Sequence, residues 1–138
     1  MTIAATSYAH VRLTVTDIER SRAFYESLFG WPIAAELSAD ADEATKERMA
    51  FLFGGVIYQL GSSLLGLRPA AGDRFDEDRV GLDHLSFSVE SRDDLEAAVV
   101  ALDRRGIAHG DVKESATGYL LEFRDPDNIA LELFATKD

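Results

Sequence analysis

Two histidines and one glutamate stand at positions from which they could share a metal ion. Residues 8–15 and 82–89 have one layout, with histidine third and apolar residues fourth, sixth and eighth, so His10 and His84 occupy equivalent points of two predicted strands. Glu132 lies between leucines in a third predicted strand. A carboxylate there is costly unless it is paired, hydrogen-bonded or metal-bound. Two imidazoles and one carboxylate suit Fe(II), Mn(II) or a related divalent ion and leave coordination positions open.

The first half of the chain is predicted to contain a strand, a helix and three further strands. The helix is expected to begin with a capping box at Thr16 and Glu19 and to end at Gly30, which tolerates a left-handed backbone. Residues 40–53 are ambiguous: we favour a helix or lid, and a buried strand over residues 49–53 is the alternative. The strands are predicted at residues 8–15, 31–37, 56–60 and 63–67.

The second half repeats this order after a polar linker at residues 69–81. A helix is expected to start at Ser91 and stop at Gly106, with an apolar stripe at helical spacing. Strands are predicted at residues 82–89, 107–112, 119–124 and 129–134, with a turn at 125–128. The chain is therefore predicted to be one α+β domain over residues 1–138. It consists of two βαβββ modules, about 6–68 and 82–136, whose mixed sheets leave one face free to form a cup.

Composition narrows the classes of function. The 138 residues include 14 Lys and Arg against 25 Asp and Glu, a formal net charge of −11, which argues against nucleic acid or an anionic membrane as partner. There is no cysteine, so disulfides, thiolate nucleophiles and Cys-ligated zinc are excluded. No signal peptide or apolar run long enough to span a membrane is evident, and we expect a cytoplasmic location.

Several motifs resemble one family. The run from His10 to Asp17, the tetrad Gly-Leu-Asp-His at 81–84 and residues 123–133 are similar to the vicinal oxygen chelate superfamily, as is the duplicated βαβββ unit. This superfamily contains glyoxalase I, extradiol dioxygenases and the fosfomycin- and bleomycin-resistance proteins. The resemblance implies a metal site at His10, His84 and Glu132, a small organic substrate chelated through vicinal oxygens, and a homodimer.

The sequence departs from the family at the fourth ligand that glyoxalase I carries, a glutamate late in the first module. Depending on the alignment of the two halves, Gly66 or Gln59 occupies that position, and neither is a carboxylate. The resemblance therefore disfavours glyoxalase I and implies a three-ligand site for one divalent ion, which is Fe, Mn, Zn or Ni. Only Lys113 and Arg124 are nearby cations in sequence, which disfavours a phosphonate-binding enzyme.

The expected function is a metal-dependent dioxygenase or a lyase or isomerase. Tyr119 is a candidate proton donor, and Arg12 and Tyr58 are candidate substrate contacts, although packing roles are open for both tyrosines and an acid partner is open for Arg12. His109 lacks a partner in the repeat and is interpreted as a surface or structural residue. Two alternatives remain: a non-catalytic binder of a small molecule or drug, as in bleomycin resistance, and a dimerisation surface without a ligand.

Overall fold

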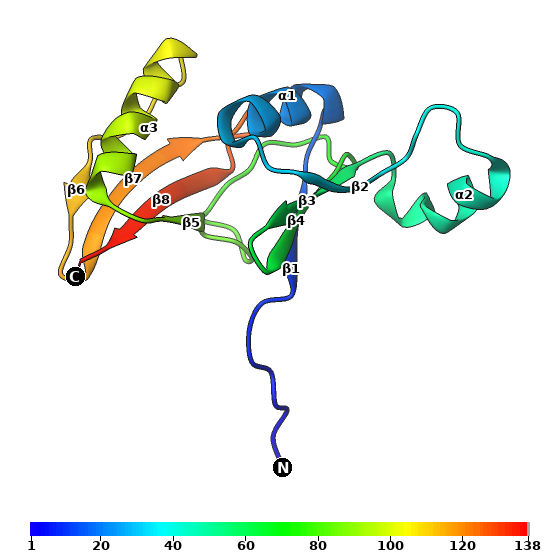
Figure 1. The fold of residues 1–138 in the computed structure, drawn as a ribbon, viewed down its shortest axis with the longest axis horizontal. Coiled ribbons are helices and arrows are strands. Elements are labelled where there is room, and N and C mark those ends of the chain that lie inside the picture. The colour runs from blue at the N-terminus through cyan, green and yellow to red at the C-terminus, as the bar shows by residue number, and fades with distance from the viewer. Residues whose placement is uncertain (138) are drawn as a thin grey trace. The chain divides into compact units, whose positions relative to one another are not determined.

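The computed structural model describes residues 1–137, which form two compact units divided between Asp73 and Arg74. Each unit contains one long helix beside one four-stranded mixed sheet, and Figure 1 shows both sets of elements in chain order. The unit boundary falls inside the predicted linker at residues 69–81. The predicted α+β class and the duplicated βαβββ order are confirmed.

The first unit has the sheet order β1-β4-β3-β2. Strands β1 and β4 are parallel, and the other neighbours are antiparallel. Its helix α1 packs on β4. The elements are β1 (His10–Thr14), α1 (Ile18–Phe29), β2 (Ile33–Glu36), α2 (Glu43–Arg48), the 3-10 helix η1 (Ala50–Leu52), β3 (Val56–Leu60) and β4 (Ser63–Arg68).

The second unit repeats this arrangement with the order β5-β8-β7-β6. Strands β5 and β8 are parallel, β8–β7 and β7–β6 are antiparallel, and α3 packs on β7 and β8. The elements are β5 (Leu85–Val89), α3 (Arg92–Arg104), β6 (Lys113–Glu114), β7 (Gly118–Arg124) and β8 (Ala130–Thr136). Sheet topology therefore places β5 in the role of β1 and β8 in the role of β4.

The helix boundaries follow the predicted capping chemistry, with one correction. The cap of α1 is Asp17, whose carboxylate accepts from the Arg20 amide, and not Thr16. Ser91 caps α3 in a capping box in which Asp94 replaces the usual Glu or Gln. Gly30 closes α1 in the left-handed conformation, with φ 65°, as predicted.

Two other segments clarify or correct the prediction. Residues 40–53 contain α2 and η1, so the helical alternative holds and the strand alternative does not. No strand forms over residues 107–112, because His109 makes only an isolated bridge to Phe123 and pairing with β7 begins at Lys113. No helix within residues 1–137 has the length and apolar character needed to cross a membrane.

Each sheet buries the face that its long helix covers. In β8 the buried residues Leu131 and Leu133 alternate with the partly exposed Ala130 and Glu132, as the period of two predicted. The first unit behaves in the same way: the helix-facing core includes Leu13, Tyr25, Tyr58, Leu65 and Leu67. Hydrophobic burial thus decides which face is occupied by packing and which face remains available for polar side chains.

His109 supplies a pH-dependent contact in the second unit. Its Nδ1 lies 2.6 Å from the Gly110 carbonyl oxygen and its Nε2 lies 2.7 Å from Asp103 Oδ1. Two acceptors can be satisfied together only by an imidazolium with a proton on both nitrogens. The Gly110 carbonyl, followed by Asp103, accordingly raises the pKa of His109 above 6.5.

A group whose pKa is higher in the folded chain stabilises the fold fully below its unfolded pKa, and this stabilisation is lost as pH rises through the folded value. We therefore expect the free energy of unfolding in urea to fall from pH 6.5 upward. The decrease should be smaller in His109→Gln and in Asp103→Asn. An unchanged pH profile in both variants would show that the contact contributes nothing.

Candidate metal site

A cavity of about 200 Å³ in the second unit contains two of the three predicted metal ligands. Its walls come from β7, β8, the start of β5 and the linker. Its charged lining residues are Glu77, Asp83, His84, Glu122, Arg124 and Glu132. The cavity therefore combines one imidazole and one guanidinium with four carboxylates.

The parallel pairing of β5 with β8 brings His84 and Glu132 together. Ser86 stands opposite Glu132 in this register, and its hydroxyl donates to Glu132 Oε1 at 2.8 Å. His84 precedes Ser86 by two residues on the same face of the sheet. Its Nε2 lies 3.6 Å from Glu132 Oε2, and the Glu132 side chain is only 12% exposed. Ser86 thus fixes one carboxylate oxygen while the other faces the histidine.

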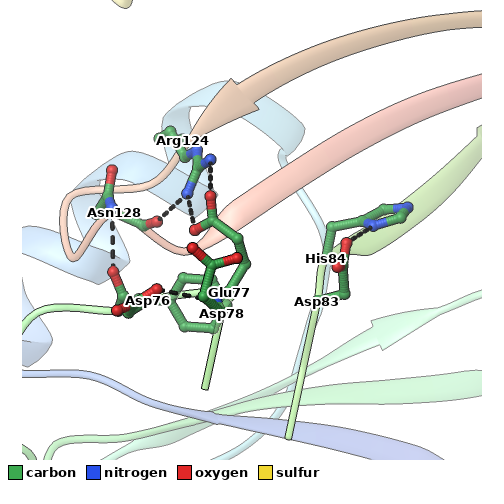
Figure 2. A network of polar contacts seen from close by, with 8 residues as sticks. Asp76, Glu77, Asp78, Asp83, His84, Arg124 and Asn128 are labelled. Atoms are coloured by element: carbon green, nitrogen blue, oxygen red, sulfur yellow. Dashed lines mark hydrogen bonds and ion pairs between the residues drawn. The ribbon is translucent and has the colours of Figure 1, made fainter. Parts of the chain in front are cut away.

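Asp83 fixes the other side of the imidazole. Its Oδ1 lies 2.6 Å from His84 Nδ1. This contact, drawn as a dashed line in Figure 2, and then the charge of Glu132 raise the pKa of His84 above its ordinary value. In the neutral ring, a proton on Nδ1 leaves the Nε2 lone pair directed toward Glu132. Such a carboxylate–histidine contact is the usual support of a metal-bound histidine.

Glu122 is a cavity residue that the sequence reasoning missed. It stands opposite Glu132 in the antiparallel pairing of β7 with β8 and lines the same cavity. Like charges at directly opposed strand positions are destabilising, and a bound cation relieves the repulsion. Counting outward from the predicted turn at residues 125–128 would have paired Glu122 with Leu131, because the loop that pairs Arg124 with Ala130 is one residue longer than predicted.

The positive charge of Arg124 is already engaged by the linker. Its two terminal nitrogens donate to the two carboxylate oxygens of Glu77 at 2.9 and 2.8 Å, and one of them also donates to the Asn128 carbonyl oxygen (Figure 2). The Arg124 guanidinium lowers the pKa of Glu77 to about 2. Arg124 is therefore a clamp between the linker and the β7–β8 turn.

In the first unit, strand register identifies the residue equivalent to Glu132. Parallel pairing sets Arg12 opposite Gly66, and Arg12 follows His10 by two residues as Ser86 follows His84. Gly66 therefore occupies the position of Glu132, whereas Gln59 lies on β3 opposite Leu64. The structure decides between the two sequence alignments in favour of Gly66.

The two candidate tyrosines lie on the helix-covered faces of their sheets. Tyr58 is fully buried, and its hydroxyl donates to Glu26 of α1 at 2.8 Å. Tyr119 has the strand parity of the buried Leu121, and the Arg92 guanidinium of α3 lies 5.0 Å from its ring centre. The structure does not bring Tyr119 together with His84 and Glu132, which occupy the opposite face.

The donor atoms of the second unit fit two ligands of one divalent ion. Ligand atoms about 2.1 Å from a metal lie at most about 4.2 Å apart, so the 3.6 Å between His84 Nε2 and Glu132 Oε2 is compatible with a shared ion. Within residues 1–137, no group of three or more His, Cys, Asp and Glu side chains is close enough to hold a metal. His10 stands exposed at the start of β1 in the first unit.

Comparison with known proteins identifies the class and the family. The two mixed sheets define an α+β fold of the glyoxalase type, shared at a TM-score of 0.77 with the glyoxylase/bleomycin resistance protein/dioxygenase domain from Frankia sp. EAN1pec. That structure is 33% identical, over 98% of this chain and 95% of its own. Residues 7–133 match the Glyoxalase/Bleomycin resistance protein/Dioxygenase superfamily, to which this chain belongs.

Other relatives differ in the activities that their names describe. The uncharacterized protein YaeR of Escherichia coli K12 is 30% identical over 91% of this chain and 92% of its own. Catechol-2,3-dioxygenase of Bacillus subtilis 168 is 26% identical over 96% of this chain, which spans 42% of that enzyme. A FosX mutant from Listeria monocytogenes, complexed with Mn(II) and 1S,2S-dihydroxypropylphosphonic acid, shares the fold at a TM-score of 0.69 and 15% identity, covering 99% of this chain and 95% of its own.

The opposed carboxylates predict a stability gain when one is neutralised. In metal-free protein at alkaline pH, Glu122→Gln should raise the free energy of unfolding by roughly 0.2–1 kcal/mol, because it removes the repulsion from Glu132. Urea denaturation measures this gain, which should disappear in a Glu132→Gln background. An equal gain in both backgrounds would show that the two carboxylates do not interact.

Proposed function

We propose that this protein is a metal-dependent enzyme in which His10, His84 and Glu132 hold one divalent ion. The pairing of His84 with Glu132 inside an acidic cavity carries the proposal, because an imidazole nitrogen and a carboxylate oxygen converge there and each group has a supporting contact. His10 is included because it has the same place in β1 that His84 has before β5. The ion is Fe, Mn, Zn or Ni.

The residues around the two ligands have distinct roles. Asp83 holds the His84 ring in the orientation that presents Nε2, and Ser86 holds one oxygen of Glu132 so that the other is available. Glu122 adds negative charge beside Glu132 and so favours a cation over water in the cavity. A bound divalent ion supplies Lewis acidity to two neighbouring oxygens of a small organic substrate.

The reaction class follows from the ligand count. With Gly66 in the equivalent position, the first module offers no second carboxylate, so a four-ligand glyoxalase I site is disfavoured. The ion pair with Glu77 engages Arg124, the arginine that lines the cavity, so the cavity of the second unit does not favour a phosphonate group of the FosX kind. The relation to catechol-2,3-dioxygenase supports ring-cleaving oxygenation, with isomerase or lyase chemistry on an oxygen-chelated substrate as the other member of the class.

A non-catalytic binder of small molecules is the alternative function. The observation that favours it is the match of residues 7–133 to a superfamily whose description includes bleomycin resistance proteins. Under either function we expect a homodimer, by analogy with the family, and size-exclusion chromatography with light scattering measures this. A monomer at all accessible concentrations would remove the homodimer from the proposal.

Metal binding is the direct test of the enzyme proposal. Protein purified without chelators should hold about one divalent ion per chain by elemental analysis, because three ligands suffice for a site with open positions. His84→Ala and Glu132→Ala should abolish this content. Asp83→Asn should weaken metal affinity by about 10- to 100-fold, because it removes the support of a ligand and not the ligand itself.

The matched control is His109→Ala, which removes a histidine outside the cavity and should leave the metal content unchanged. His10→Ala is measured separately, because a retained affinity would exclude His10 while leaving His84 and Glu132 in place. A wild-type metal content below about a tenth per chain, unchanged in His84→Ala, would overturn the enzyme proposal and favour the binder.

A further inference from the structure

The two units differ in charge at one pair of equivalent positions. In the second unit the register pairs Ser86 with Glu132, and in the first unit it pairs Arg12 with Gly66. A neutral hydroxyl and a carboxylate are thus replaced by a guanidinium and a hydrogen atom. This pair of positions carries a negative charge in the second sheet, at Glu132, and a positive charge in the first, at Arg12.

The arginine at position 12 and the glycine at position 66 depend on each other, because the arginine side chain lies against the glycine. A Cβ atom at Gly66 would lie 2.9 Å from Arg12 Cγ and 3.4 Å from Arg12 Nε. The Arg12 stem therefore occupies the volume that a side chain at position 66 would need. A carboxylate side chain therefore does not fit at position 66 while Arg12 keeps this conformation, and Arg12 puts a positive charge where the second unit has a negative one.

The guanidinium of Arg12 is held in place but is not neutralised. One terminal nitrogen donates to the Phe51 carbonyl oxygen at 2.9 Å, and the guanidinium carbon lies 5.9 Å from the centre of the Phe51 ring. Its Nε is buried and has no hydrogen-bond partner in the part of the chain that the structure describes. An unsatisfied buried donor destabilises a fold, so folding stability alone does not account for this placement.

Two other arginines of this acidic chain illustrate full pairing with carboxylates. Arg22 contacts Glu26 at 2.6 Å and Glu36 at 2.8 Å, and Arg124 is clamped by Glu77. Within the first unit, residues 1–73, no carboxylate pairs with Arg12. Its neighbours on the face of β1, β3 and β4 that lies opposite α1 carry no negative charge. They include His10, Thr14, Ile57, Gln59, Leu64 and Arg68.

We propose that Arg12 is the binding position for an oxyanion of the ligand, so that the ligand is a small organic acid. Its terminal nitrogens offer the planar, paired N–H donors that match a carboxylate, while the Phe51 carbonyl and ring fix the plane of the group. This inference deepens the proposed function and rests on it only for the claim that the acid is a substrate. The binding of the anion is independent of the metal.

The competing explanation is that Arg12 only fastens η1 to the sheet through Phe51. Arg12→Met separates the two roles, because methionine keeps an aliphatic stem over Gly66 and removes every N–H donor. Arg12→Lys keeps the charge and one donor but lacks paired donors in one plane. Arg48→Met is the matched control, since it removes the same charge from α2 in the same unit.

The experiment uses the full chain, stripped of metal with EDTA and dialysed free of it. Malonate, benzoate and inorganic phosphate are titrated by calorimetry, with malonamide as the uncharged counterpart of malonate. We expect saturable binding of at least one of the anions and none of malonamide. The affinity should fall at least about tenfold in Arg12→Met, fall less in Arg12→Lys and stay unchanged in Arg48→Met.

The proposal is overturned if wild type binds none of the three anions saturably, or if Arg12→Met binds them as wild type does. Circular dichroism and urea denaturation of Arg12→Met confirm that the variant is folded; if it is not, Arg12→Lys decides by the same criterion. Metal content of Arg12→Met, measured in parallel, should equal that of wild type. Failed anion binding with normal metal content refutes this inference alone, whereas anion binding without metal refutes the proposed enzyme alone.

Discussion

The structure depends on one constraint, the parallel pairing of the first and last strands of each βαβββ unit. In the second unit this pairing sets Ser86 beside Glu132 and so brings the carboxylate to within reach of His84. A shift of one residue would turn Glu132 toward the helix-covered face and would expose the leucines beside it. The burial of Leu131 and Leu133 beneath α3 therefore fixes the register that assembles the polar site.

The same constraint acts on both units, and their difference lies in the side chains that it pairs. In each unit a histidine is followed two residues later by a residue, Arg12 or Ser86, that faces a partner position on the neighbouring strand. In the second unit that partner is a carboxylate, and in the first it is Gly66 covered by Arg12. The two modules thus share one scaffold, while at this pair of positions the second carries a carboxylate and the first carries a guanidinium.

Repulsion among the carboxylates of the cavity lowers the stability of the protein when no metal is bound. Glu122 and Glu132 oppose each other across an antiparallel pair, and Asp83 adds a third acid beside His84. Arg124 attracts Glu122 and Asp83 as well, but its terminal nitrogens are held by Glu77, so it relieves this charge only in part. An excess of carboxylates around a single imidazole is expected where a cation binds. Because this excess opposes folding, we attribute it to function.

Periodicity and capping are local properties, so the sequence by itself determined the features that depend on them. These are the duplicated βαβββ order, the helix cap at Ser91, the end of α1 at Gly30 and the face on which His84 and Glu132 lie. Tertiary structure decided what depends on pairing between distant strands. It equated Gly66 with Glu132, set Glu122 opposite Glu132, and placed Tyr58 and Tyr119 on helix-covered faces. Strand register and helix packing join residues tens of positions apart, and neither is a property of any single stretch of sequence.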